Sequence, residues 1–240
     1  MWSVALVKMQ RRKFLNTCAA AAIAATPAFT LAADASPRYY ARARLVQPDG
    51  NPLRATAVPP HTNLVFHYPF AATPCFLLNL GRRLEAGAPL RTADAQTYRW
   101  PGGVGRERSI VAYSAICAHK MSHPTRQVSF ISYRADRSRG TRGSRVIHCC
   151  SEHSAYDPAQ GAVVVGGPAL QPLAAILLDY DDRDDGLYAV GTLGGEMFEE
   201  FFSKFEFRLS MEFGGKARQP AGDTCQVVEL AKYCRQQVKC

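Results

Sequence analysis

Two short pairings of a cysteine with a histidine constrain this chain more than any other feature. Cys117 and His119 form a Cys-x-His motif, Cys150 and His153 form a Cys-x2-His motif, and residues 120–149 separate them. Each motif is short enough to lie on one tight loop, so two loops can present two thiolates and two imidazoles to a common centre. Tetrahedral zinc accepts this donor set. An iron–sulfur cluster with two cysteines on one iron and two histidines on the other accepts it equally well.

The residues that flank the motifs favour the iron–sulfur option. An apolar stretch, residues 109–116, leads into the first motif; Tyr156 and Asp157 follow the second, and Gly167-Pro168 begins a later Gly-Pro-Ala turn. In these features residues 105–175 resemble the Rieske iron–sulfur family. A zinc-stabilised binding module without a redox role is the alternative.

The resemblance implies a ligand set for a Rieske-type [2Fe-2S] cluster. It assigns Cys117 and Cys150 to the inner iron and His119 and His153 to the outer iron, which lies nearer to solvent. Histidine ligation raises the reduction potential because a neutral imidazole replaces an anionic thiolate.

The resemblance also assigns residues around the cluster. Tyr156 is the candidate donor to a ligand sulfur, Ser154 is a second candidate tuning residue, and Gly167 with Pro168 resembles the covering loop. Rieske proteins of bc complexes usually carry a disulfide between the two ligand loops. Ser122 and Glu152 stand at those two positions here, so that disulfide is absent.

The rest of the chain from residue 38 has a β pattern of short apolar runs bounded by proline or glycine. The runs that predict strands are residues 42–46, 63–69, 74–80, 109–113, 127–133, 162–165 and 187–191. Helices are expected at about 196–204 and 227–237. The expected fold is mainly β, a Rieske-type antiparallel sandwich or barrel with one or two short C-terminal helices. It would span residues 36–240, with a cluster-binding subdomain at 105–175 and a C-terminal extension at 195–240.

The N-terminal 35 residues have the pattern of an export signal. Arg11 and Arg12 precede Phe14-Leu15 and an alanine-rich apolar run, which together resemble a twin-arginine signal. We therefore expect a periplasmic protein, and an uncleaved signal would anchor it to the inner membrane.

The remaining cysteines suit an oxidising compartment. The chain has eight cysteines, and a disulfide among Cys225, Cys234 and Cys240, or from one of these to Cys75, is expected in a periplasmic protein. Cys149 adjoins Cys150 and is open to three interpretations: a decoy, a buried thiol or a disulfide partner. His123 and His148 are interpreted as surface or core histidines.

The formal charge of +9 is partly concentrated in an arginine-rich segment, residues 134–145. No aromatic residues alternate with these arginines, which argues against nucleic-acid binding. The segment is interpreted as a solvated loop or as a docking surface for an acidic partner.

These features together predict an electron-transfer protein that is not catalytic on its own. The resemblance implies a subunit of a membrane quinol-oxidising complex that passes electrons to a c-type cytochrome. The rival is the small Rieske subunit of a periplasmic molybdenum oxidoreductase resembling arsenite oxidase.

Overall fold

The computed structural model describes residues 35–87, 89–136 and 144–240. The predicted export signal therefore lies outside the described residues apart from Ala35, and so does most of the arginine-rich segment. In the part that is described, no helix has the length and apolar character needed to cross a membrane.

The larger of two main sheets has eight strands in the order β14-β1-β13-β12-β6-β3-β2-β15. They are Thr224–Gln226 (β14), Arg38–Val46 (β1), Gly186–Leu193 (β13), Ala175–Asp181 (β12), Ile110–Ser114 (β6), Pro74–Asn79 (β3), Leu64–His67 (β2) and Val228–Glu229 (β15). Neighbours are antiparallel except β1 and β14, which are parallel.

Both faces of this sheet are covered by apolar side chains. Successive side chains of a strand point to opposite faces, and in β3 Phe76 and Leu78 enter one core while Cys75 and Leu77 enter another. This explains why β3 is a continuous apolar run instead of an alternating one.

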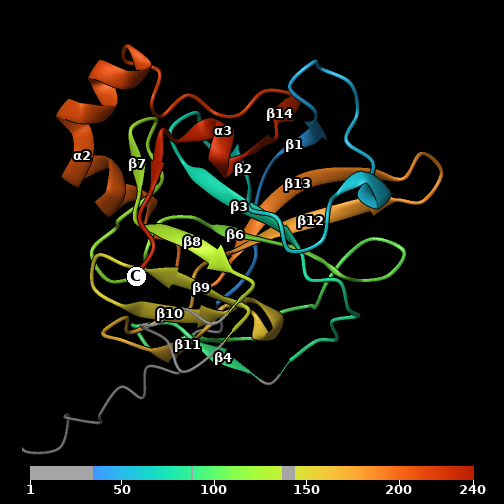
Figure 1. Cartoon of the computed structure of the whole chain (residues 1–240), viewed down its shortest axis with the longest axis horizontal. Coiled ribbons are helices and arrows are strands. Elements are labelled where there is room, and N and C mark those ends of the chain that lie inside the picture. Colours follow the sequence, from blue (N-terminus) through green and yellow to red (C-terminus); the bar gives the residue numbers. More distant parts are fainter. Residues whose placement is uncertain (1–34, 88, 137–143) are drawn as a thin grey trace, which may run out of the picture. The chain divides into compact units, whose positions relative to one another are not determined.

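The smaller main sheet has four antiparallel strands in the order β11-β10-β9-β8. They are Val163–Gly166 (β11), Ser154–Asp157 (β10), Val146–Cys149 (β9) and Ile131–Arg134 (β8). Ile131 and Ile147 share the core that contains Phe76, so this sheet packs on one face of the larger sheet (Figure 1). The mainly β class predicted from the sequence is confirmed.

Short elements complete the structure. They are the strands β4 (Leu90–Arg91), β5 (Thr97–Tyr98), β7 (Val128–Ser129) and β16 (Gln236–Gln237), and the 3-10 helices Ala55–Ala57 and Pro158–Gln160.

Two α-helices lie in the C-terminal extension, α2 (Phe198–Phe213) and α3 (Leu230–Tyr233). Helix α2 is longer than predicted and ends at Gly214, whose left-handed conformation lets its N–H bond to the carbonyl of Ser210. The second predicted helix, 227–237, is reduced to one turn. Its two ends pair as strands instead, Val228–Glu229 with β2 and Gln236–Gln237 with β7.

The buried face of α2 packs on the segment that carries the first motif. Phe198, Phe201, Phe202 and Leu209 form a core with Ile116, the residue before Cys117. His123 is also buried here, with its ring edge-on to Phe201 at 4.8 Å between centroids, as expected of a core histidine.

We predict that Phe201→Ala lowers the free energy of unfolding by about 3–5 kcal/mol, because Phe201 is fully buried and its truncation leaves a cavity. Phe207 lies on the same helix and is 79% exposed, so Phe207→Ala is the matched control. It should change the free energy of unfolding by less than about 0.5 kcal/mol. Urea unfolding followed by circular dichroism measures both, and equal effects would contradict the packing described for α2.

Candidate metal centre

The first motif lies on a tight loop after β6. The N–H of Cys117 bonds to the carbonyl of Ser122 at 2.9 Å, and the N–H of Met121 bonds to the carbonyl of Cys117 at 2.9 Å. These two bonds close the loop around His119. Cys117 is buried at its base, and His119 is half-buried.

The second motif forms the turn between β9 and β10. Cys149 ends β9 and pairs with Ser154 at the start of β10, so residues 150–153 are the turn itself. His153 has a positive φ of 58° and is exposed. Gly167 supports the turn from below, because a Cβ at that position would clash with the carbonyl of His153 and with the Cα of Ser154. Gly167 thus lies against the backbone of the second loop; its role in covering a cluster stays a prediction.

The sulfur atoms of Cys117 and Cys149 meet at the base of the two loops. Both thiols are buried and hydrogen-bonded to each other. The Tyr156 hydroxyl lies 3.2 Å from Cys117 Sγ and accepts a hydrogen bond from the N–H of Ala118 at 3.1 Å. When Cys117 is a thiolate, the only proton in its contact with Tyr156 is that of the hydroxyl, so Tyr156 donates and the sulfur accepts. The structure therefore places the Tyr156 hydroxyl in contact with the Cys117 sulfur; that this sulfur is a metal ligand stays a prediction.

This arrangement favours a thiolate at Cys117. The hydrogen bond from Cys149, followed by the one from Tyr156, outweighs burial and lowers the pKa of Cys117 to about 6. The pKa of Cys149 is raised, because its proton is held in the bond to Cys117 and its sulfur is desolvated.

Cys150 does not join this sulfur pair, contrary to the ligand assignment expected from the Cys-x2-His spacing. Its sulfur is bonded to Cys240 in a disulfide, with the two Cα atoms 5.7 Å apart. A disulfide sulfur carries no thiolate charge and cannot serve as a ligand in this state. The sequence predicts a disulfide among Cys225, Cys234 and Cys240, or from one of these to Cys75, and the bond between Cys150 and Cys240 is none of these. Cys75, Cys225 and Cys234 are buried free thiols.

The alternation of β9 could have revealed the difference. Side chains of a strand alternate between faces, and Ile147 and Cys149 both enter the main core while Cys150 lies beyond it. Cys149 therefore faces Cys117, as the apolar character of position 147 indicates.

Polar atoms around the sulfur pair lack partners among the described residues. His119 Nδ1 and Ser154 Oγ are buried without a hydrogen bond. Buried polar groups are normally satisfied, so an imidazole nitrogen and a hydroxyl left free beside two thiols fit a bound metal group with acceptor atoms. A hydrogen bond from Lys120 on the first loop, together with its charge, lowers the pKa of Glu152 on the second.

A second close group lies on the outer side of the turn. Ligand atoms of His148, His153 and Cys240 fall within 4.8 Å of one another. His148 is fully buried, as a core histidine, and its Nδ1 lies 3.4 Å from Cys240 Sγ. Since Cys240 is in the disulfide, this group offers two imidazoles and no thiolate.

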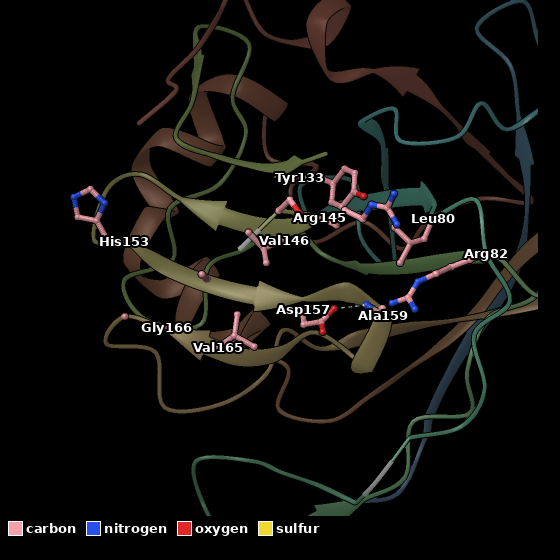
Figure 2. Close-up of a pocket in the computed structure, with 13 residues that line it drawn as sticks. Leu80, Arg82, Tyr133, Arg145, Val146, His153, Asp157, Ala159, Val165 and Gly166 are labelled. Atoms are coloured by element: carbon pink, nitrogen blue, oxygen red, sulfur yellow. Dashed lines mark hydrogen bonds between the residues drawn. The ribbon is translucent and has the colours of Figure 1, made fainter. Parts of the chain in front are cut away.

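A cavity of about 800 Å³ opens beside His153 and runs along the smaller sheet (Figure 2). Figure 2 shows His153 at one end, with Arg145 and Arg82 farther along near Tyr133. Both arginines are exposed. The cavity therefore joins a candidate metal ligand to a positively charged rim.

No family model matches this chain. Among solved structures it is similar to the soluble domain of the Rieske protein II (soxF) from Sulfolobus acidocaldarius. The two are 26% identical, the match covers 65% of this chain and 82% of the other, and the TM-score is 0.45. Because that TM-score describes a partial superposition, the interpretation of the site rests on the residues of this chain.

We predict that Tyr156→Phe raises the pKa of Cys117 above its value of about 6 in metal-free protein, because the thiolate loses a hydrogen-bond donor. Thiolate absorbance at 240 nm, recorded against pH, measures the shift. Tyr113→Phe is the matched control, since the buried Tyr113 hydroxyl bonds to the carbonyl of Pro158 and not to a sulfur. An unchanged titration in Tyr156→Phe would contradict the described contact.

Proposed function

We propose that this protein is a Rieske-type electron-transfer protein that holds a [2Fe-2S] cluster between its two loops. The observation that carries the proposal is the buried Cys117–Cys149 sulfur pair, with the unpaired His119 Nδ1 beside it. In this proposal Cys117 and Cys149 bind the inner iron, and His119 and His153 bind the outer iron. Cys149 takes the place that the motif spacing gives to Cys150.

Such a cluster would supply a one-electron redox centre. The chain's own residues then set its surroundings. Tyr156 would donate to the Cys117 sulfur, and the unpaired Ser154 hydroxyl would donate a second hydrogen bond to the bound cluster; both would stabilise negative charge at the centre. The burial of the two thiols keeps water from the inner side.

His153 provides the route to a partner. It is exposed while the thiols are buried, so the partner would approach from its side. Its imidazole has a second nitrogen that can hold a proton when the first is a ligand, which allows electron and proton uptake to be coupled.

The charge beside His153 favours an acidic partner. Arg82 and Arg145 line the same cavity as this histidine, farther along it, and complementary charge accelerates the encounter of two proteins. A c-type cytochrome of net negative charge fits this face. The twin-arginine pattern supports a periplasmic location, with a membrane quinol-oxidising complex as electron donor. Assembly with a molybdenum subunit is the second candidate, supported by the same export pattern.

We predict that the purified protein contains about two iron and two acid-labile sulfide per chain and gives a Rieske-type EPR spectrum when reduced. Cys117→Ser and Cys149→Ser should each abolish the signal, because each removes a thiolate of the inner iron. Cys75→Ser is the matched control: Cys75 is a buried free thiol in the other core and its loss should leave the signal intact. Stoichiometric zinc without iron would refute the redox function in favour of a zinc module.

We also predict that Arg82→Glu combined with Arg145→Glu slows electron transfer to an acidic c-type cytochrome by about tenfold or more at low ionic strength. The difference should shrink as salt screens the charges. Arg183→Glu is the control, since Arg183 is an exposed arginine on the β12–β13 turn, paired with Asp181 and not part of the cavity lining. Equal stopped-flow rates for the Arg82/Arg145 double variant and for Arg183→Glu would exclude docking at this face.

A further inference from the structure

The C-terminal tail, residues 234–240, runs beside the segment that links the two motifs. The N–H groups of Arg235, Gln236 and Val238 bond to the carbonyls of Arg126, Gln127 and Ser129 at 3.0, 3.0 and 2.9 Å. Strand β16 pairs in parallel with β7 as part of this run. The tail is therefore placed by regular backbone pairing before it reaches the second ligand loop.

The end of the tail is joined to the second ligand loop at one point. Cys240 is bonded to Cys150. Beside this bond the Arg134 guanidinium donates to the carbonyl of Val238 at 2.5 Å, and the same nitrogen lies 3.7 Å from Cys150 Sγ. The tail thus meets the turn through a covalent bond and a charged hydrogen bond.

The surface ion pair between the two ligand loops is weak. Lys120 Nζ lies 3.0 Å from Glu152 Oε1, but these side chains are 59% and 35% exposed. Exposed ion pairs contribute little. Among the described residues, the disulfide to Cys240 is the one covalent constraint on the turn 150–153.

The position of Cys150 makes that constraint relevant to the metal centre. It is the neighbour of Cys149 and opens the turn that ends at His153. His153 has a left-handed backbone conformation, which a non-glycine residue adopts only where its surroundings impose it. The tail and Gly167 supply those surroundings from two sides.

We propose that Cys240 is a positioning residue, and that the tail, closed by its disulfide to Cys150, holds the second ligand loop in the geometry that a metal centre needs. The effect on the cluster rests on the proposed function. The effect of the Cys150–Cys240 disulfide on the loop of residues 150–153 does not. Closure forms one S–S bond and breaks two S–H bonds. Two electrons and two protons pass to a disulfide-bearing oxidant of the thiol–disulfide exchange class.

The test compares Cys240→Ser with Cys234→Ala in the full chain. Cys234 is a buried free thiol of the same tail, so its variant removes a sulfur and keeps the disulfide. Peptide mapping without reduction should find Cys150 joined to Cys240 in the wild type and in Cys234→Ala. Free thiols at both positions in the wild type would overturn the proposal.

Hydrogen exchange of metal-free protein is the second measurement. Amides of residues 147–155 should exchange about tenfold faster in Cys240→Ser than in the wild type, because the turn opens more often. Cys234→Ala should match the wild type over that segment. Equal exchange rates in all three proteins would overturn the proposal that the disulfide holds the second ligand loop, whether or not a cluster binds.

The third measurement uses protein that carries iron. Loss of iron to a ferrous chelator should be about tenfold faster in Cys240→Ser and in Cys150→Ser than in Cys234→Ala, because a more open turn releases His153 more often. Absence of the cluster from Cys150→Ser, with normal iron retention in Cys240→Ser, would overturn the proposal and make Cys150 a ligand. A wild-type protein without iron and sulfide would instead refute the proposed function. The hydrogen-exchange measurement would still test whether the disulfide holds the second ligand loop.

Discussion

The interaction between the thiols of Cys117 and Cys149 lies within the core that the two main sheets share. Cys117 follows β6 of the larger sheet and Cys149 ends β9 of the smaller one, so both sheets must be in place for the sulfurs to touch. Burial of polar groups costs free energy unless they are hydrogen-bonded. Tyr156 forms such a bond with Cys117, and its hydroxyl in turn accepts a hydrogen bond from the N–H of Ala118. The residues of the candidate site are thus also residues of the core.

The C-terminal extension supports each loop by different means. Helix α2 packs its phenylalanines against Ile116, and Lys204 donates to the carbonyl of Lys120 at 2.9 Å, which steadies the first loop. The tail reaches the second loop through β16 and the disulfide. A region far from the motifs in sequence therefore contacts both ligand loops.

The β class and most strands of the larger sheet could be predicted from the sequence, because short apolar runs such as residues 74–80 carry their own signal. Strands β9 and β10 had no such signal. Polar and cysteine residues interrupt both sequences. The two strands form because they pair with each other and cover the main core. The predicted helix at 227–237 failed for a related reason, since its ends gain non-local strand partners that local propensity does not reveal.

From the sequence we could predict that two loops each carry a cysteine and a histidine, and that Tyr156 lies near them. Motif spacing chose Cys150 as the second thiolate, because spacing treats the turn as isolated. The structure brings Cys149 to Cys117 instead, since strand alternation turns that side chain inward. The division of the chain into a subdomain and an extension, and the export signal, stay predictions.

The Cys150–Cys240 bond also changes the connectivity of the molecule. It closes a covalent ring over a sequence separation of 90 residues, and that ring contains β12 and β13 from the middle of the larger sheet. A single cut in the exposed turn between these strands would open the ring without separating the two pieces. The loop that carries His153 would stay attached to the C-terminal piece even after the backbone between them had been severed.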